Sequence, residues 1–160
     1  MRTVNVFDAE HELDEDDPPG YRAGALRVSE SLGADGLAVK SFVLSPGEAL
    51  CPYHYEYEEE WLLVLEGTIV LRTPEGEQEM SRGEMAAFPP GPAGAHKTTN
   101  RGSAPARLLM FSSAREPSVA VYPDSDKIGV WPGNPDDEVM LLRRDGKVGY
   151  YEGEAGEGSE

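Results

Sequence analysis

The sequence predicts an all-β protein. Its 18 glycines and 13 prolines separate many short apolar runs, a composition that favours strands and turns over helices. The runs are short enough for strands, and some of them alternate between apolar and polar residues. The chain has 160 residues, which is the length of a single domain. Short strands at this spacing suit two sheets packed as a jelly-roll barrel, because closing the barrel hides strand edges.

The strands are expected at intervals along the chain, each bounded by a turn. Residues 37–44, LAVKSFVL, form an apolar strand closed by Ser-Pro-Gly. Residues 50–57 alternate, so His54 and Glu56 share one face and Cys51 points to the other. The other strands are expected at residues 25–30, 61–65, 68–73, 78–80, 84–88, 96–99, 106–112 and 118–122, with a terminal hairpin of residues 139–142 and 148–151.

Four regions follow from this pattern. Residues 1–23 are an acidic arm in which His11 is expected to be solvated, and residues 24–114 contain the barrel. Residues 115–151 form a C-terminal extension. Residues 152–160 are nearly all glycine and glutamate, so a disordered tail is expected.

Charge and composition narrow the partners. A net charge of −16 opposes binding to nucleic acid and to anionic membrane surfaces, because both are negatively charged. There is one cysteine, no apolar run of membrane-spanning length and no apolar N-terminal stretch like a signal sequence. These features predict a cytoplasmic protein whose partner is a small molecule.

Two stretches carry the residues that suit a metal. Histidine is scarce, with three in the chain, yet His54 and His96 each lie in a strand beside carboxylates. Glu60 follows Glu56 after a short polar step that would turn the chain back. We therefore expect His54, Glu56, Glu60 and His96 to converge inside the barrel on one divalent ion.

The same stretches resemble the two motifs of the cupin superfamily. The first reads Gly47, six residues, His54, one residue, Glu56, three residues, Glu60, six residues, Gly67. The second reads Gly83, five residues, Pro-Pro-Gly, four residues, His96, three residues, Asn100. Glu56 stands where the family usually has a second histidine, and the turn before His96 is two residues longer than usual. The resemblance implies a double-stranded β-helix, a metal site in its lumen, and an extension of residues 115–151 that packs on the barrel or on a second subunit.

Two imidazoles and two carboxylates would make a mixed nitrogen and oxygen site. Such a ligand set admits Mn²⁺, Fe²⁺, Zn²⁺ or Ni²⁺. With Cys51 expected on the other face, no thiolate would reach the ion. Protonated imidazole cannot bind a metal, so affinity is expected to fall below about pH 6, given a reference pKa of about 6.5. Four protein ligands would leave two open octahedral positions on the ion, which is room for a bidentate small molecule such as a hydroxy-acid, a diol or a sugar. Such a site would suit an oxygenase or an isomerase.

Two alternatives remain open. His54, Glu56 and His96 also fit the two-histidine, one-carboxylate triad of Fe(II) oxygenases, with Arg107 at an offset that resembles the basic residue of 2-oxoglutarate-dependent enzymes. The other alternative is a barrel without metal that binds a small ligand and catalyses nothing.

A homodimer is expected because Tyr53, Tyr55 and Trp61 would expose more aromatic surface than a small monomer usually does.

Overall fold

The protein is built almost entirely from antiparallel strands. The computed structural model describes residues 1–113, 115–134, 136–150 and 152. The elements in chain order are β1 (Ala23–Arg27), α1 (Val28–Leu32), β2 (Leu37–Leu44), β3 (Tyr55–Glu56), β4 (Glu60–Glu66), β5 (Thr68–Thr73), β6 (Gly76–Ser81), β7 (Met85–Phe88), η1 (Pro92–Gly94), β8 (Lys97–Thr99), β9 (Ala106–Ser113), β10 (Ser118–Tyr122), η2 (Pro123–Ser125), β11 (Lys127–Trp131), β12 (Met140–Arg143) and η3 (Arg144–Gly146).

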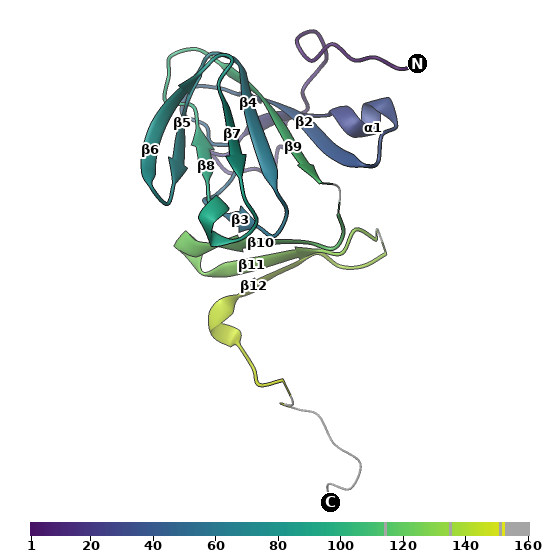
Figure 1. Cartoon of the computed structure of the whole chain (residues 1–160), viewed down its shortest axis with the longest axis vertical. Helices are drawn as coiled ribbons and strands as arrows, with labels where there is room; N and C mark the ends of the chain where they lie inside the picture. The colour runs from purple at the N-terminus through teal and green to yellow at the C-terminus, as the bar shows by residue number, and fades with distance from the viewer. Residues whose placement is uncertain (114, 135, 151, 153–160) are drawn as a thin grey trace, which may run out of the picture.

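Two sheets form the barrel, as the sequence predicted. One has the order β1-β2-β9-β4-β7 and the other the order β6-β5-β8 (Figure 1). Their facing side chains make the main core, which is typical of a jelly roll. The core residues include Leu44, Leu62, Val64, Ile69, Leu71, Met80, Phe88 and Leu108.

Strand alternation explains which side chains enter this core. On β9, Ala106 and Leu108 are fully buried and Met110 is 9% exposed, whereas Arg107 points to the outer face. β9 lies between β2 and β4, where it pairs with both over most of its length. It therefore acts as the central strand that fixes the register of the larger sheet.

Two motif residues have structural roles at the ends of strands. Gly67 has φ of 76°, and a Cβ there would lie 2.8 Å from the carbonyl oxygen of Pro105, so only glycine fits. Asn100 is fully buried and its side chain donates to the carbonyl oxygens of Leu44 and Ala104. Its own oxygen accepts from the backbone of Gly102. The turn beside the barrel is thus held by a satisfied buried amide.

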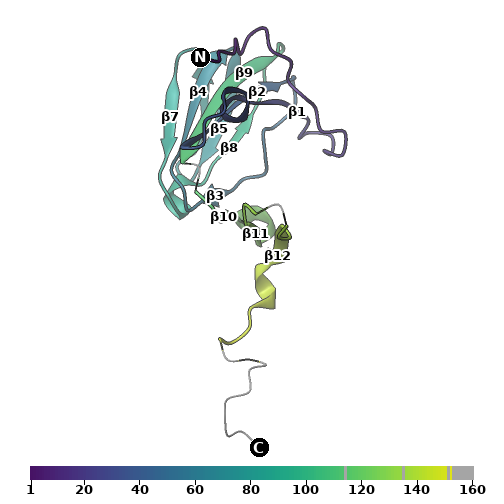
Figure 2. The ribbon, with the colours of Figure 1, turned by 90° about the vertical axis from the view of Figure 1, so that its right-hand side faces the viewer.

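The extension forms a third sheet across one end of the barrel (Figures 1 and 2). Its order is β12-β11-β10-β3, so β10 pairs with β3 and joins the extension to the barrel. Tyr53 and Tyr55, each 8% exposed, pack there with Ala95 and Val121 in a second core. Outside it, Arg72 of β5 makes two hydrogen bonds to Asp124, at 2.6 and 2.9 Å.

Several local predictions were wrong. Residues 50–53 bend instead of continuing a strand, so only Tyr55–Glu56 is β3. Residues 28–32 form a short helix that ends at Gly33 in the left-handed conformation. The terminal hairpin is absent from the described residues, because β12 pairs with β11, a strand that the sequence did not indicate. The tail beyond residue 152 lies outside the described residues.

Candidate metal centre

A direct pairing of backbones brings the two histidines together. His54 donates its N–H to the carbonyl oxygen of His96 at 3.1 Å, and His96 donates back at 2.8 Å. This antiparallel bridge places the two residues opposite each other, so both side chains project from the same face. The ring centroids are 4.8 Å apart. The bridge thus holds His54 and His96 opposite each other, although both residues lie outside the named strands.

Glu60 reaches the same point from the first residue of β4. One carboxylate oxygen, Oε2, lies 3.8 Å from Nε2 of His54 and 3.8 Å from Nε2 of His96. The donor atoms of the three residues all lie within 4.8 Å of one another. This His/Glu/His cluster is therefore a group that could hold a metal ion. The structure brings together three of the four residues that the sequence selected.

Glu56 lies beside the cluster but outside it. Its Oε1 is 3.9 Å from Nε2 of His54, and its Oε2 is 3.5 Å from the hydroxyl of Ser118, which donates to it. Ser118 belongs to β10, so the extension contributes to the site. A role for Glu56 as a fourth ligand stays a prediction.

Backbone carbonyls set the orientation of both imidazoles. Nδ1 of His96 is 2.9 Å from the carbonyl oxygen of Gly94, and Nδ1 of His54 is 3.1 Å from that of Pro52. With the proton on Nδ1 in each ring, both Nε2 atoms present lone pairs towards Glu60. Nε2 of His96 is buried and has no hydrogen-bond partner among the described residues. A buried acceptor without a partner fits a metal ligand.

Burial tunes the charges of the cluster. Desolvation lowers the pKa of His96 to about 4 and also lowers that of His54. Desolvation and the nearby Glu56 carboxylate raise the pKa of Glu60 to about 8. The imidazoles are therefore neutral near pH 7 and Glu60 is mostly protonated. Because the pKa values of both histidines are lowered, imidazole protonation no longer predicts that metal affinity falls below about pH 6.

The prediction that Cys51 faces away from the site was wrong. Its Sγ lies 3.4 Å from Nδ1 of His54, and the residue lines the same pocket. The reason is the bend over residues 50–53, which breaks the alternation of a strand. Burial and the carboxylates of Glu60 and Glu56 raise the pKa of this thiol to about 12. Cys51 is thus a neutral neighbour of His54 near pH 7.

Arg107 does not reach the site. Its Nη1 donates to the carbonyl oxygen of Val6 at 2.5 Å, and its guanidinium lies over the ring of Phe7. His11 of the same arm is half-buried, with Nε2 at 2.9 Å from the buried hydroxyl of Ser41, so the expectation of a solvated side chain was wrong. Because Arg107 contacts the N-terminal arm and not the site, it does not lie where the basic residue of 2-oxoglutarate-dependent enzymes would be needed.

The aromatic argument for a dimer also fails in part. Tyr53 and Tyr55 are buried within the chain itself, and of the three aromatic residues Trp61 alone is exposed, at 42%. The homodimer stays a prediction that needs another basis.

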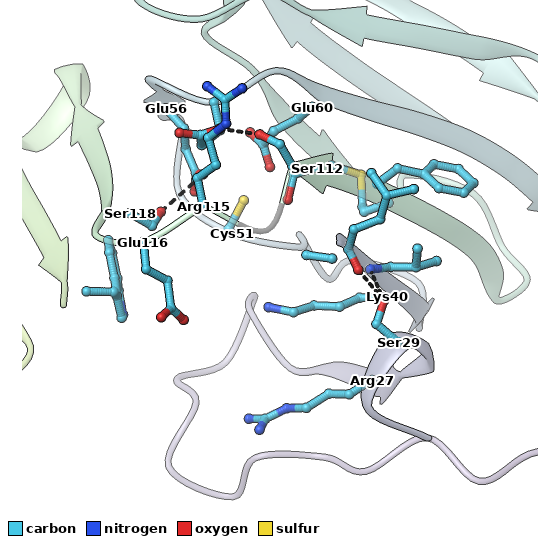
Figure 3. Close-up of a pocket in the computed structure, with 18 of the residues that line it drawn as sticks. Arg27, Ser29, Lys40, Cys51, Glu56, Glu60, Ser112, Arg115, Glu116 and Ser118 are labelled. Carbon is cyan, nitrogen blue, oxygen red and sulfur yellow. Dashed lines mark hydrogen bonds and ion pairs between the residues drawn. The ribbon is translucent and has the colours of Figure 1, made fainter. Parts of the chain in front are cut away.

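The cluster lies in a cavity of about 630 Å³, a size that accommodates a small molecule. Glu56, Glu60 and Cys51 line one side, and Lys40 and Arg27 extend into the space from the opposite side (Figure 3). The Lys40 charge lowers the pKa of both Glu60 and Glu56, against the larger effect of burial. Lys40 and Arg27 therefore lie across the pocket from Glu56 and Glu60, although Arg115 lies on the acidic side, 4.0 Å from Glu58, and Arg27 lies 3.7 Å from Glu30.

Sequence reasoning missed three residues that shape the site. The ring of Phe88 stacks on His96, Tyr122 of the extension stacks on His54 at 5.9 Å, and Lys40 lines the facing wall. Of these three residues, only Phe88 could have been found from the sequence, because it lies within the second motif. The other two depend on chain packing.

A jelly-roll barrel with a His/Glu/His cluster in a small-molecule cavity defines a class of ligand-binding barrels that can carry a metal. Residues 40–112 match the family model described as the Cupin domain. This match identifies residues 40–112 as a cupin domain, and the solved structures that resemble the chain share its fold.

Individual relatives cover most of the chain. A sugar phosphate isomerase of the cupin superfamily from Silicibacter pomeroyi matches with a TM-score of 0.77 and 28% identity, over 91% of this chain and 94% of that chain. The tetracenomycin polyketide synthase protein TcmJ of Streptomyces glaucescens is 29% identical over 103 residues, which are 62% of this chain and 68% of that protein. The polyketide cyclase RemF of Streptomyces resistomycificus shares the fold, with a TM-score of 0.58 and 24% identity over 74% of this chain and 83% of that chain.

No helix within the described part of the chain is long and apolar enough to span a membrane.

Proposed function

We propose that this cupin is a metal-dependent isomerase of a small phosphorylated sugar or a related polyhydroxy molecule. The observation that carries the proposal is the pairing of a His/Glu/His cluster with basic side chains on the facing wall of one cavity. The similarity to the sugar phosphate isomerase over nine-tenths of the chain supports it.

In this proposal His54, Glu60 and His96 hold the divalent ion. Their donor set of two neutral nitrogens and one oxygen admits Mn²⁺, Fe²⁺, Zn²⁺ or Ni²⁺. When bound, the ion supplies a Lewis acid that polarises the carbonyl oxygen of the substrate. Binding requires Glu60 to lose its proton, which the positive charge favours.

Glu56 is assigned the proton transfer. Its carboxylate accepts a proton from the hydroxyl-bearing carbon next to the substrate carbonyl and returns it to the carbonyl carbon, while the hydroxyl proton of that neighbouring carbon passes to the former carbonyl oxygen. These two proton transfers interconvert the aldose and ketose forms without a net change of atoms. Desolvation raises the pKa of Glu56, which makes it a stronger base than a solvated carboxylate. The hydroxyl of Ser118 holds the other carboxylate oxygen and keeps its direction.

Lys40 and Arg27 are assigned to the phosphate end of the substrate. A chain of net charge −16 repels an anion, so local cations must compensate at the point of binding. Both side chains are exposed at the cavity and can adjust to a phosphate.

The test is an isomerase assay of the metal-loaded protein with a panel of aldose and ketose phosphates. Glu56→Gln should retain metal while the rate falls by about a hundred-fold or more, the contribution of a general base. Metal loss in Glu56→Gln would instead make Glu56 the fourth ligand. Lys40→Gln should raise KM for the phosphorylated sugar and leave kcat nearly unchanged.

Three results would contradict the proposal. Near-zero metal in wild type and in His96→Ala alike, after purification without chelator, would leave a small-ligand-binding cupin. Turnover without any dependence on Glu56 would remove its proton-transfer role. Metal binding with no turnover of any sugar phosphate would remove the isomerase assignment.

A second candidate is a step in the assembly of an aromatic polyketide. It is favoured by the similarity to TcmJ and by an apolar part of the cavity wall that includes Phe42, Phe111 and Trp131. A poly-β-ketone substrate has no phosphate, so its turnover should be insensitive to Lys40→Gln. That variant separates the two candidates.

A further inference from the structure

One histidine of the N-terminal arm contacts three neighbouring strands of the larger sheet. Nε2 of His11 lies 2.9 Å from the hydroxyl of Ser41 on β2. On β1, a Cβ added to Gly24 would lie 3.1 Å from the Cβ of His11, so the arm passes close to that strand. On β9, Nη1 of Arg107 lies 3.4 Å from the same Nε2. His11 is thus the point at which the arm meets β1, β2 and β9 together.

The hydrogen bonds of His11 determine which ring nitrogen carries the proton. Nδ1 lies 3.0 Å from the carbonyl oxygen of Ala9, which can only accept, so the proton is on Nδ1. In the neutral ring Nε2 is then an acceptor, and the hydroxyl of Ser41 donates to it. Ser41 is fully buried, and its side chain makes no other hydrogen bond within the described residues. The docked arm therefore fits the neutral imidazole.

A second proton on His11 would disturb this contact in two ways. Nε2 would become a donor, so the hydroxyl of Ser41 would have to turn and leave its own hydrogen without an acceptor in a buried place. The imidazolium would also face the guanidinium of Arg107 at 3.4 Å, and like charges repel. The pKa of His11 is lowered in agreement with this geometry: burial is the largest cause, the Ala9 carbonyl opposes it, and the charge of Arg107 adds to it.

Nearby carboxylates do not offset this repulsion. Oε2 of Glu66 on β4 lies 3.9 Å from Nε of Arg107, but the Glu66 side chain is 62% exposed and water screens it. Glu10 and Glu12 flank His11 in the arm and are both exposed. The groups of β1 and β2 that face the ring carry no charge. Within the described part of the chain, no carboxylate forms an ion pair with His11.

His11 leads directly into the loop of residues 13–17. Glu12 and Ala25 exchange two backbone hydrogen bonds, at 2.9 and 2.8 Å. These bonds join the arm to β1, the outermost strand of its sheet. His11 and this bridge therefore hold the N-terminal end of the loop in place.

The loop borders a second cavity, which adjoins the metal cavity. The second cavity has a volume of about 660 Å³, and the loop forms one of its sides. Arg27 and Phe42 line both cavities, so the two are neighbours. A movement of the loop would therefore change access to the metal cavity from this side.

We propose that His11 is a pH-sensitive anchor: a second proton on its ring releases the arm from β1, β2 and β9 and loosens the loop of residues 13–17 beside the metal cavity. Release begins as the pH falls through about 6.5, the usual pKa of imidazole, because the undocked ring takes up a proton more readily than the docked ring. The device depends neither on the metal nor on the proposed isomerase activity.

Hydrogen–deuterium exchange of the full chain tests the release. After normalisation to intrinsic rates, the amides of Glu12 and Ala25 should lose protection by at least about three-fold between about pH 7.5 and 5.5. The amide of Gly83, which donates to the carbonyl oxygen of Val64 in the barrel, should keep its protection. Protection of Glu12 and Ala25 that does not change with pH would overturn the proposal.

Two variants assign the effect to the imidazole. His11→Gln keeps an uncharged acceptor for Ser41 and should remove the pH dependence of exchange. Glu10→Gln changes the exposed neighbouring residue of the arm and is the matched control, which should behave as wild type does. An equal loss of protection in His11→Gln and wild type would overturn the proposal. So would a pKa of His11 that is the same in the folded chain and in urea.

Labelling of Cys51 tests the effect on the cavity and needs no metal. Cys51 is the one cysteine of the chain and lines the metal cavity. The ratio of labelling rates by a pyridyl disulfide, wild type over His11→Gln, cancels the pH dependence of the thiol itself. This ratio should be near one at about pH 7.5 and at least about two-fold higher at about pH 5.5. A ratio that stays near one at both pH values would overturn the link between the arm and the cavity.

Discussion

The imidazole of His96 lies flat on the ring of Phe88, with centroids 3.6 Å apart and planes inclined by 9°. Phe88 is also the strand partner of Glu60 across β7 and β4. One buried aromatic residue therefore touches one member of the His/Glu/His cluster and pairs with another. The direction in which Nε2 of His96 points depends on this contact as well as on the carbonyl oxygen of Gly94.

Phe88→Leu should therefore weaken metal binding by about ten-fold, as loss of an orienting neighbour does. The free energy of unfolding should fall by roughly 1–2 kcal/mol, because Phe88 is 4% exposed and part of the core. Calorimetric metal titration measures the first effect. Ile69→Val, another core substitution, should lose similar stability and keep its affinity. Equal metal affinities of Phe88→Leu and wild type would contradict the role of the stack.

Metal binding near pH 7 should release close to one proton. Glu60, with a pKa of about 8, holds a proton in the metal-free protein, whereas the lowered pKa values of His54 and His96 leave both rings neutral. Affinity should therefore rise with pH up to about 8. Titration in buffers of different ionisation enthalpy counts the protons. Glu60→Gln should release none, and release that grows only below pH 6 would assign the proton to an imidazole.

Without metal, stability should fall as pH rises from about 7 to 8. Over this window the unfolded chain has lost the Glu60 proton while the folded protein retains it, so proton loss favours unfolding. The lowered pKa values of His54 and His96 act in the opposite direction near pH 6.5, where each ring of the unfolded chain still binds about half a proton, and this opposition fades by about pH 7.5. The slope should be negative above about pH 7 and smaller in size than the single-proton limit of about 1.4 kcal/mol per pH unit, because folded Glu60 itself loses its proton as the pH nears 8. Urea unfolding with chelator measures it, and Glu60→Gln should abolish it. A flat profile in wild type would show that Glu60 titrates normally.

The ion pair between Arg72 and Asp124 should help to hold the extension on the barrel. Arg72 also lies over the ring of Tyr53, with its Cζ 3.9 Å from the centroid. Both charged side chains are about half exposed, so the coupling should not exceed about 1 kcal/mol. A double-mutant cycle of Arg72→Met and Asp124→Asn measures it by urea unfolding. Additive effects would show that the pair contributes nothing.

The sequence by itself determined the class of fold, because that class depends on turns and strand periods that are local. It located β2, β5 and β10 and selected His54, Glu60 and His96 as a group, since motif spacing carries that information. The wrong predictions for Cys51 and His11 both arose from local assumptions that the packing of the chain overrides. Cys51 and His11 were placed by assuming a regular strand and a free arm, but residues 50–53 bend and the arm packs on the barrel.

Tertiary structure alone decided the electrostatics and the walls of the site. The pKa shifts of Glu60 and His96 arise from burial, which no residue's own identity specifies. Lys40 and Tyr122 reach the cavity because β2 and β10, distant in the chain, both border it. The exposed edge of β12 likewise appears only when its partner is known to be β11, since exposure is a property of the assembled sheet.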